Sequence, residues 1–275
     1  MRGVGVTSAL TDALPPALVP VLELLTQLGD AWFVMVAVAA VYWVGPRYGL
    51  LSARDATRYA AVGLAAFGAI VALKGVFALP RPPASVALVH TDGHGFPSGH
   101  ATAAAALYGG AAALFARPAR RARWLLAAGF VAVVSATRLL LGVHYLVDVL
   151  AGALVGTLVV ACVLALTRRR HSVGFLFAAA LGVCALGAAG PTVDALASVG
   201  ITLGALCGYA VATRYGRARV SAPLALCGLV VFGGFGIAAL KAPLPGYGVV
   251  ITSMVAGAGV LALPATQSLR QNFSR

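Results

Sequence analysis

Six ionisable side chains lie within, or at one end of, long apolar segments of this sequence. They are Lys74, Arg81, His100, Arg138, His144 and Asp148. An ionisable group at membrane depth costs several kcal/mol, so each of them is a candidate for a functional site. For any one residue taken alone, a cation that extends to the membrane surface or a structural ion pair explains the charge equally well.

The positions of these residues along the expected helices bring them to one level of the membrane. Lys74 comes 15 residues, or about 22 Å, after the start of its apolar segment, and Arg138 comes 14 residues, or about 21 Å, after the start of its own. His100 and Asp148 fall in the first turns of segments that enter from the surface these cations approach. Unrelated structural charges would not converge in this way, so the pattern indicates a functional site.

The residues at this level suit an anion. Arg81 follows Lys74 by two helical turns, and prolines on both sides of it end the helix there. Ser98 can cap the next helix, Gly99 lets a ligand approach the backbone, and the free N–H groups of a helix start favour negative charge. Arg138 adds a planar fork that matches phosphate oxygens.

His144 and Asp148 stand four residues apart on one helix face, where the carboxylate can hold one imidazole nitrogen. Three cations, two histidines and one carboxylate suit phosphoryl transfer, because cations and N–H groups stabilise the charge on the transition-state oxygens. One histidine can attack phosphorus, and the other can protonate the leaving oxygen. A two-metal site needs several carboxylates, so we expect no metal ion and no cofactor.

Three motifs in this order resemble the signature of the type 2 phosphatidic acid phosphatase superfamily, which includes lipid phosphate phosphatases and undecaprenyl pyrophosphate phosphatases. The motifs are Lys74-x6-Arg81-Pro82, Pro97-Ser98-Gly99-His100 and Arg138-x5-His144-x3-Asp148. The resemblance covers about residues 10–167. Thr137 stands where the family usually has serine, which keeps a hydroxyl group at that position.

The resemblance implies a role for each matching residue. The phosphate would be bound by Lys74, Arg81, Ser98, Gly99 and Arg138. His144 would be the nucleophile that becomes phosphohistidine, Asp148 would orient it, and His100 would protonate the leaving group and then activate water. The implied activity is metal-independent hydrolysis of the mono- or pyrophosphate ester of a membrane lipid.

The composition places these motifs in a polytopic membrane protein. Of 275 residues, 61% are hydrophobic and 10% are charged, against about a quarter charged in a soluble domain. Continuous apolar runs exclude a soluble enzyme, a disordered chain and a coiled coil, and they disfavour a β-barrel. The net charge of +13 lies mostly in short links, so we expect no nucleic-acid partner. The four cysteines are expected to be free thiols.

We expect an all-α transmembrane bundle of about nine spans, because one crossing needs about 20 apolar residues. The expected spans are residues 31–50, 59–80, 98–116, 124–141, 145–167, 173–190, 192–213, 221–240 and 248–267. Residues 13–28 have one apolar helical face, but Pro20 and Glu23 argue against a full crossing. We therefore expect an interfacial helix there, capped by Thr11 or Asp12, with a tenth span as the alternative.

Arginines mark the cytoplasmic side of the membrane. Alternate links carry Arg47, Arg54 and Arg58, then Arg117, Arg120, Arg121 and Arg123, then Arg168, Arg169 and Arg170, then Arg214, Arg217 and Arg219. The amino terminus and the site are thus expected outside the cell membrane, and the carboxyl terminus inside. We divide the chain into an interfacial segment (1–30), a five-span phosphatase core (31–172) and four further spans of unassigned role (173–275).

Three other functions would use the same residues. A haloperoxidase shares the anion site, but its known members are soluble, and nine expected spans argue against it. A lipid headgroup phosphotransferase would have the same site and a different acceptor. An anion transporter would need polar residues that continue across the bilayer, whereas the segments beyond the site are apolar. His90, Asp92 and His94 are expected in a solvated loop, and Asp194 is expected to cap a helix. The identity of the lipid and the oligomeric state stay open.

Overall fold

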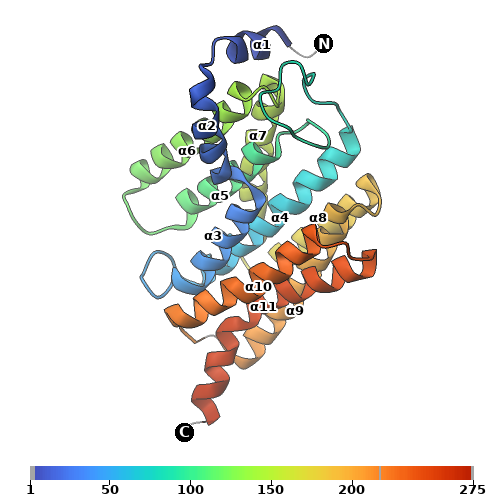
Figure 1. Cartoon of the computed structure of the whole chain (residues 1–275). Helices are drawn as coiled ribbons and strands as arrows, with labels where there is room; N and C mark the ends of the chain where they lie inside the picture. The colour runs from blue at the N-terminus through green and yellow to red at the C-terminus, as the bar shows by residue number, and fades with distance from the viewer. Residues whose placement is uncertain (1–3, 217, 274–275) are drawn as a thin grey trace.

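The computed structural model describes residues 4–216 and 218–273, with side chains up to residue 268, and every regular element in these residues is a helix (Figure 1). The N-terminal elements are α1 (Val4–Asp12), the 3-10 helix η1 (Pro16–Leu18), α2 (Val19–Thr26) and the 3-10 helix η2 (Gln27–Gly29). The next five are α3 (Ala31–Val44), α4 (Ala53–Phe77), α5 (Gly99–Leu114), α6 (Arg120–Leu140) and α7 (Leu146–Leu166). The last four are α8 (Ser172–Ala189), α9 (Val193–Tyr215), α10 (Ala222–Lys241) and α11 (Gly246–Phe273).

The expected membrane bundle of helices is confirmed, and each of the nine expected spans coincides with one helix from α3 to α11. Within the described residues, seven helices are long and apolar enough to cross a membrane, namely α4 and α6 to α11. The other two, α3 and α5, are shorter, with 14 and 16 residues. Helix α3 ends early because Gly45 and Pro46 follow it, and Pro97 stands just ahead of α5.

The N-terminal segment differs from the single helix expected over residues 13–28. The helical stretch from 16 to 29 consists of α2 between two 3-10 helices, and it meets α1 at an angle of 98°. Thr11 does not cap this stretch, because it lies inside α1 and its hydroxyl donates to the carbonyl of Thr7. The prolines at 15 and 16 interrupt the helix and explain the bend. The two arms together have the length and composition of a broken span or a re-entrant loop.

Small residues allow the helices to approach closely. Helix α4 lies in the middle of the bundle and packs against α3, α5, α7, α8 and α9. Gly152 and Gly156 bring α7 against α5, since a Cβ atom on Gly152 would stand 2.5 Å from the carbonyl oxygen of Ser98, and one on Gly156 would meet the backbone of α5. Backbone contact of this kind replaces the hydrophobic effect as the main attraction between helices in lipid.

The C-terminal helices form a second packed group beside α4. Glycines at 200, 204 and 208 bring α9 against the backbone of α11, and α8 joins this pair to α4. Two polar groups of α3 also reach α11. The Tyr42 hydroxyl donates to the carbonyl of Leu261 over 3.1 Å, and the Trp43 indole N–H donates to that of Val260 over 2.8 Å. Helix α10 lies in front of this group in Figure 1.

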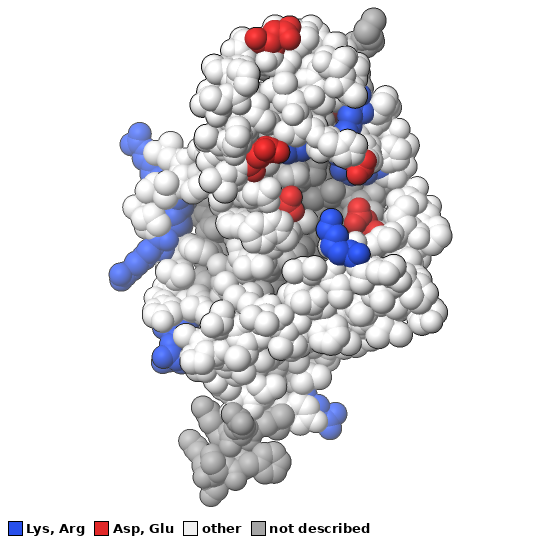
Figure 2. Space-filling view, viewed as in Figure 1, with Lys and Arg blue, Asp and Glu red and all other residues white. Residues whose placement is uncertain are grey.

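Charged side chains are unevenly distributed over the molecule. In Figure 2, basic side chains gather along the left edge, at the α5–α6 end, while acidic and basic side chains together surround a hollow near the middle. The α5–α6 connection exposes Arg117, Arg120 and Arg121. It lies at the opposite end of α5 from the loop 83–97 (Figure 1). The four cysteines are free and exposed on the outer surfaces of the helices.

The two ends of α5 should respond differently to a thiol reagent that cannot cross the membrane. In a background without the native cysteines, Ser85→Cys in the loop 83–97 should be labelled in intact cells, because the arginine asymmetry puts this loop outside. Ala119→Cys, equally exposed on the other end, should be labelled only after the cells are permeabilised. The reverse pattern would move the charged site to the cytoplasmic face.

Candidate functional site

A tight turn between α6 and α7 returns His144 to the end of the bundle where α5 begins. Gly142 adopts φ +71°, a left-handed conformation that glycine accepts without strain. His144 and Asp148 are both almost fully buried, at 1% and 0% exposure. The Nδ1 atom of His144 lies 3.5 Å from Oδ2 of Asp148, somewhat longer than an ordinary hydrogen bond. The same Oδ2 accepts a hydrogen bond from the backbone N–H of Tyr145 over 3.0 Å, so the carboxylate also caps α7.

Arg81 approaches the other nitrogen of His144. Its Nη1 atom lies 3.1 Å from His144 Nε2 and also donates to the carbonyl of Val143. Its Nε and Nη2 atoms donate to the carbonyl of Asp92, and Nε also to that of Gly93. A guanidinium has no acceptor, so Nε2 of His144 must accept and the ring proton must sit on Nδ1, facing the carboxylate.

The protonation state of His144 follows from its surroundings. Burial lowers the pKa of His144 to about 3, and the positive charges of Arg81 and Arg138 act in the same direction against the carboxylate of Asp148. The imidazole is therefore neutral at physiological pH. Its Nε2 lone pair points towards the cations, which is the form that a histidine nucleophile needs.

The start of α5 lies against α7 beside this pair. Ser98 is the N-cap of α5, as expected, and its Oγ accepts from the N–H of Ala101 over 3.5 Å. The N–H of Ser98 donates to the carbonyl of Asp148 over 2.9 Å, which joins the second motif to the third. A Cβ atom on Gly99 would stand 3.8 Å from Nζ of Lys74, so the ammonium lies directly beside this helix start.

Arg138 completes a group of three cations. Its side chain is 4% exposed, its Nη1 donates to the hydroxyl of Thr26 over 3.0 Å, and its Nε has no hydrogen-bond partner among the described residues. Lys74, Arg81 and Arg138 are close enough to repel one another. An anion placed among them would relieve this repulsion and accept from the buried Nε.

His100, on the first turn of α5, has an acidic neighbour that the sequence analysis did not identify. Its Nε2 lies 3.6 Å from Oδ2 of Asp30, which is also the N-cap of α3 and accepts from the N–H of Trp32. The neighbouring imidazole of His100 lowers the pKa of Asp30, so this carboxylate is ionised. The sequence did contain a signal for this neighbour. Asp30 is an acidic residue just before the first expected span (31–50), at the level of the other charged residues.

The N-terminal segment thus supplies two neighbours of the site, Asp30 and Thr26. It comes close because residue 29 is glycine, where a Cβ atom would stand 2.9 Å from the carbonyl oxygen of His100. The backbone of Leu28 is held there by the Tyr108 hydroxyl, which donates to its carbonyl over 2.9 Å.

The side chains of the remaining candidates form no hydrogen bond with the cluster among the described residues, although the backbone carbonyl of Asp92 holds Arg81. His90 and Asp92 contact each other at 3.1 Å in the loop, both strongly exposed. The expectation that Asp194 caps α9 is wrong, because the cap is Thr192. Thr192 stands at the first position before the helix, where its short hydroxyl reaches the N–H of Ala195 and accepts from it. Asp194 is in the first turn, close enough to attract Lys74. The described His, Cys, Asp and Glu residues form no group of three that could hold a metal ion.

Comparison with known proteins agrees with this arrangement. Residues 56–172 match the sequence profile of the PAP2 superfamily. The fold resembles a crystal structure described as the first transmembrane PAP2-type phosphatidylglycerolphosphate phosphatase from Bacillus subtilis, at 23% identity and a TM-score of 0.51 over 61% of this chain and 87% of that one. Among curated proteins, none matches the chain at a significant level. The chain has the helices of an integral membrane protein, and over residues 56–172 it is similar to the PAP2 superfamily, also known as the type 2 phosphatidic acid phosphatases.

Proposed function

We propose that this protein hydrolyses the phosphate or pyrophosphate ester of a membrane lipid through a phosphohistidine intermediate, at the outer face of the cell membrane. The proposal rests above all on one arrangement. His144 has its proton-bearing nitrogen towards Asp148 and its lone pair towards Arg81, inside a group of three cations. Similarity to the PAP2 superfamily over residues 56–172 supports the same reaction class.

The first step forms a bond between His144 Nε2 and phosphorus and breaks the bond from phosphorus to the lipid oxygen. A phosphate oxygen that accepts from Arg81 Nη1 takes the place of the imidazole there and frees the Nε2 lone pair. Positive charge then develops on the imidazole, and the carboxylate of Asp148 stabilises it. His100 gives its proton to the departing lipid alkoxide, while the cations neutralise the charge on the phosphoryl oxygens.

The second step releases phosphate. Water attacks the phosphohistidine, the bond between nitrogen and phosphorus breaks, and the neutral His100 takes the proton from water. Both histidines return to their starting forms. A lipid acceptor in place of water would make the protein a phosphotransferase, so the decisive assay measures free phosphate from a panel of lipid mono- and pyrophosphates incubated with purified protein and EDTA.

Activity should survive EDTA and should be inhibited by vanadate. The reason is that three fixed cations stand where a metal-dependent phosphatase places its ions, and they also suit the trigonal-bipyramidal vanadate. Phosphate release with and without each reagent measures this. Complete loss in EDTA that magnesium restores would contradict the mechanism.

The two histidines should differ in their dependence on the leaving group. His144→Ala should abolish turnover of every substrate, because it removes the atom that binds phosphorus. His100→Ala should slow a lipid monophosphate by about 10²- to 10⁴-fold, the usual contribution of a general acid. On p-nitrophenyl phosphate, whose leaving group needs no proton, the loss should be smaller.

Asp148→Asn should fall between the two, since it disturbs the orientation of His144 without removing it. Steady-state rates on both substrates test the assignment. If His100→Ala and His144→Ala lose equal fractions on both substrates, the proposed division of roles is wrong.

Asp30 should act as a positioning residue for His100. Asp30→Asn keeps a good helix cap but removes the negative charge that favours the imidazolium form. The alkaline limb of the pH–rate profile on a lipid monophosphate should therefore move to lower pH, by about one unit or less. Asp92→Asn, which changes the exposed His-paired carboxylate in the loop, is the matched control and should leave the profile in place. An unchanged profile in Asp30→Asn would exclude this role.

A further inference from the structure

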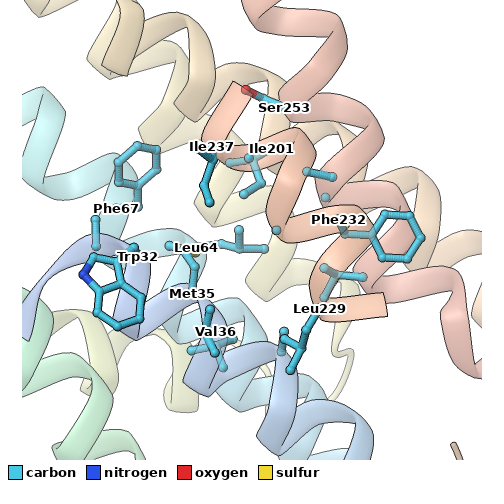
Figure 3. A pocket seen from close by; sticks show the side chains of 18 of the residues that line it. Trp32, Met35, Val36, Leu64, Phe67, Ile201, Leu229, Phe232, Ile237 and Ser253 are labelled. Atoms are coloured by element: carbon cyan, nitrogen blue, oxygen red, sulfur yellow. The ribbon is translucent and has the colours of Figure 1, made fainter. Parts of the chain in front are cut away.

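An apolar groove runs between the core helices and the C-terminal helices, on the side where α3 faces α10 (Figure 3). Its walls are α3 and α10, and its floor comes from α4, α9 and α11. Figure 3 shows Trp32, Met35 and Val36 of α3 across from Ile237 and Leu229 of α10. The lining is almost entirely hydrocarbon, and the cavity has a volume of about 200 Å³.

The groove runs along α3 and α10. Helices α3 and α10 run in opposite directions, so Trp32 and Leu240 line one end and Trp43 and Gly228 line the other. Trp32 and Trp43 are separated by 11 residues, which corresponds to about 16 Å along the helix. The wall of α10 is hollowed at Gly233 and Gly236, since a Cβ atom on either would have no neighbour within 4 Å.

One end of the groove lies next to the phosphate site. Trp32 follows the His100 neighbour Asp30 by two residues, and its indole N–H is fixed by Gln27 over 2.7 Å. On α4, the lining residue Phe67 precedes Lys74 by two helical turns, or about 10 Å. The groove therefore begins about 10 Å from the nearest cation along α4, a distance that a lipid headgroup can span, and it extends away from the cations along α3 and α10.

We infer that this groove holds a hydrocarbon chain of the lipid phosphate whose headgroup occupies the cation site, an inference that rests on the proposed function. The lipid would then lie with its phosphate among Lys74, Arg81 and Arg138 and one chain between α3 and α10. The chain-binding half is built from α9, α10 and α11, which lie outside residues 56–172. This gives the C-terminal helices a role in substrate selection.

The size of the groove favours a lipid chain over a protein partner. A helix with its side chains is about 10–12 Å across, and α3 and α10 contact each other, which leaves no room for a third helix between them. A single hydrocarbon chain is narrow enough, and the bilayer supplies no other apolar ligand with a phosphate at the level of the site. Trp32, Ile237 and Leu240 are 53%, 62% and 40% exposed, so the groove is open to lipid at the end nearer the site.

The first test fills the groove without touching the site. Gly236→Leu adds a side chain into the groove, whereas Gly234→Leu adds the same side chain to an exposed position of the same helix where a Cβ atom also has no neighbour. Both changes have the same effect on helix propensity and on apolar content. We expect Gly236→Leu to lower kcat/KM for dioleoyl phosphatidate by about tenfold or more and to leave p-nitrophenyl phosphate hydrolysis unchanged. Gly234→Leu should match the wild type on both.

The second test reads binding without turnover. A phosphatidate with a diazirine near the end of one acyl chain, irradiated with wild-type protein, should label peptides of α3 and α10, and Gly236→Leu should lose most of this labelling. The inference would be overturned if Gly236→Leu lost equal fractions of activity on both substrates or lost none on the long-chain substrate. Labelling elsewhere in the bundle would overturn it as well. Labelling in the groove without phosphate release by the wild type would instead overturn the proposed function.

Discussion

The mutual repulsion of three cations at one end of an apolar bundle is the constraint that organises this structure. Lys74, Arg81 and Arg138 interact unfavourably with one another, and little water is available there to screen them. The fold holds the two guanidinium groups with oxygen atoms, carbonyls of the loop for Arg81 and the hydroxyl of Thr26 for Arg138. These contacts fix the positions of the guanidinium groups without cancelling their charge, so their positive charge stays available to an anion.

The same cations determine the chemistry of His144. A buried imidazole beside two guanidinium groups stays neutral, and the guanidinium of Arg81 selects the tautomer that leaves Nε2 without a proton. Asp148 contributes twice, because its carboxylate lies beside Nδ1 and also accepts from the backbone at the start of α7. The carboxylate that we propose to stabilise the imidazolium is therefore held by the helix that carries it, which limits how far the pair can relax.

Helix contacts made by glycine bring these groups together and separate the two halves of the molecule. Gly152 allows α7 to lie against Ser98, so the second and third motifs meet through a backbone hydrogen bond. On the other side, glycines draw α9 against α11, while Gly233 and Gly236 leave α10 hollow where it faces α3. Close packing in one place and open space in the other create a charged site and an apolar groove within one bundle.

The sequence by itself determined the helical membrane class, the approximate bounds of α3 to α11 and the set of charges at one level, because an apolar run and an ionisable interruption are both local features. It could not find Asp30 or Thr26, since their importance depends on an N-terminal segment that bends by 98° and approaches α5 through Gly29. It also misassigned the cap of α9, which depends on which hydroxyl or carboxylate reaches the free N–H groups. Only the tertiary structure decided which nitrogen of His144 faces Arg81 and where a groove opens between α3 and α10. These features depend on the distance and direction between side chains far apart in the chain, and local sequence pattern does not encode them.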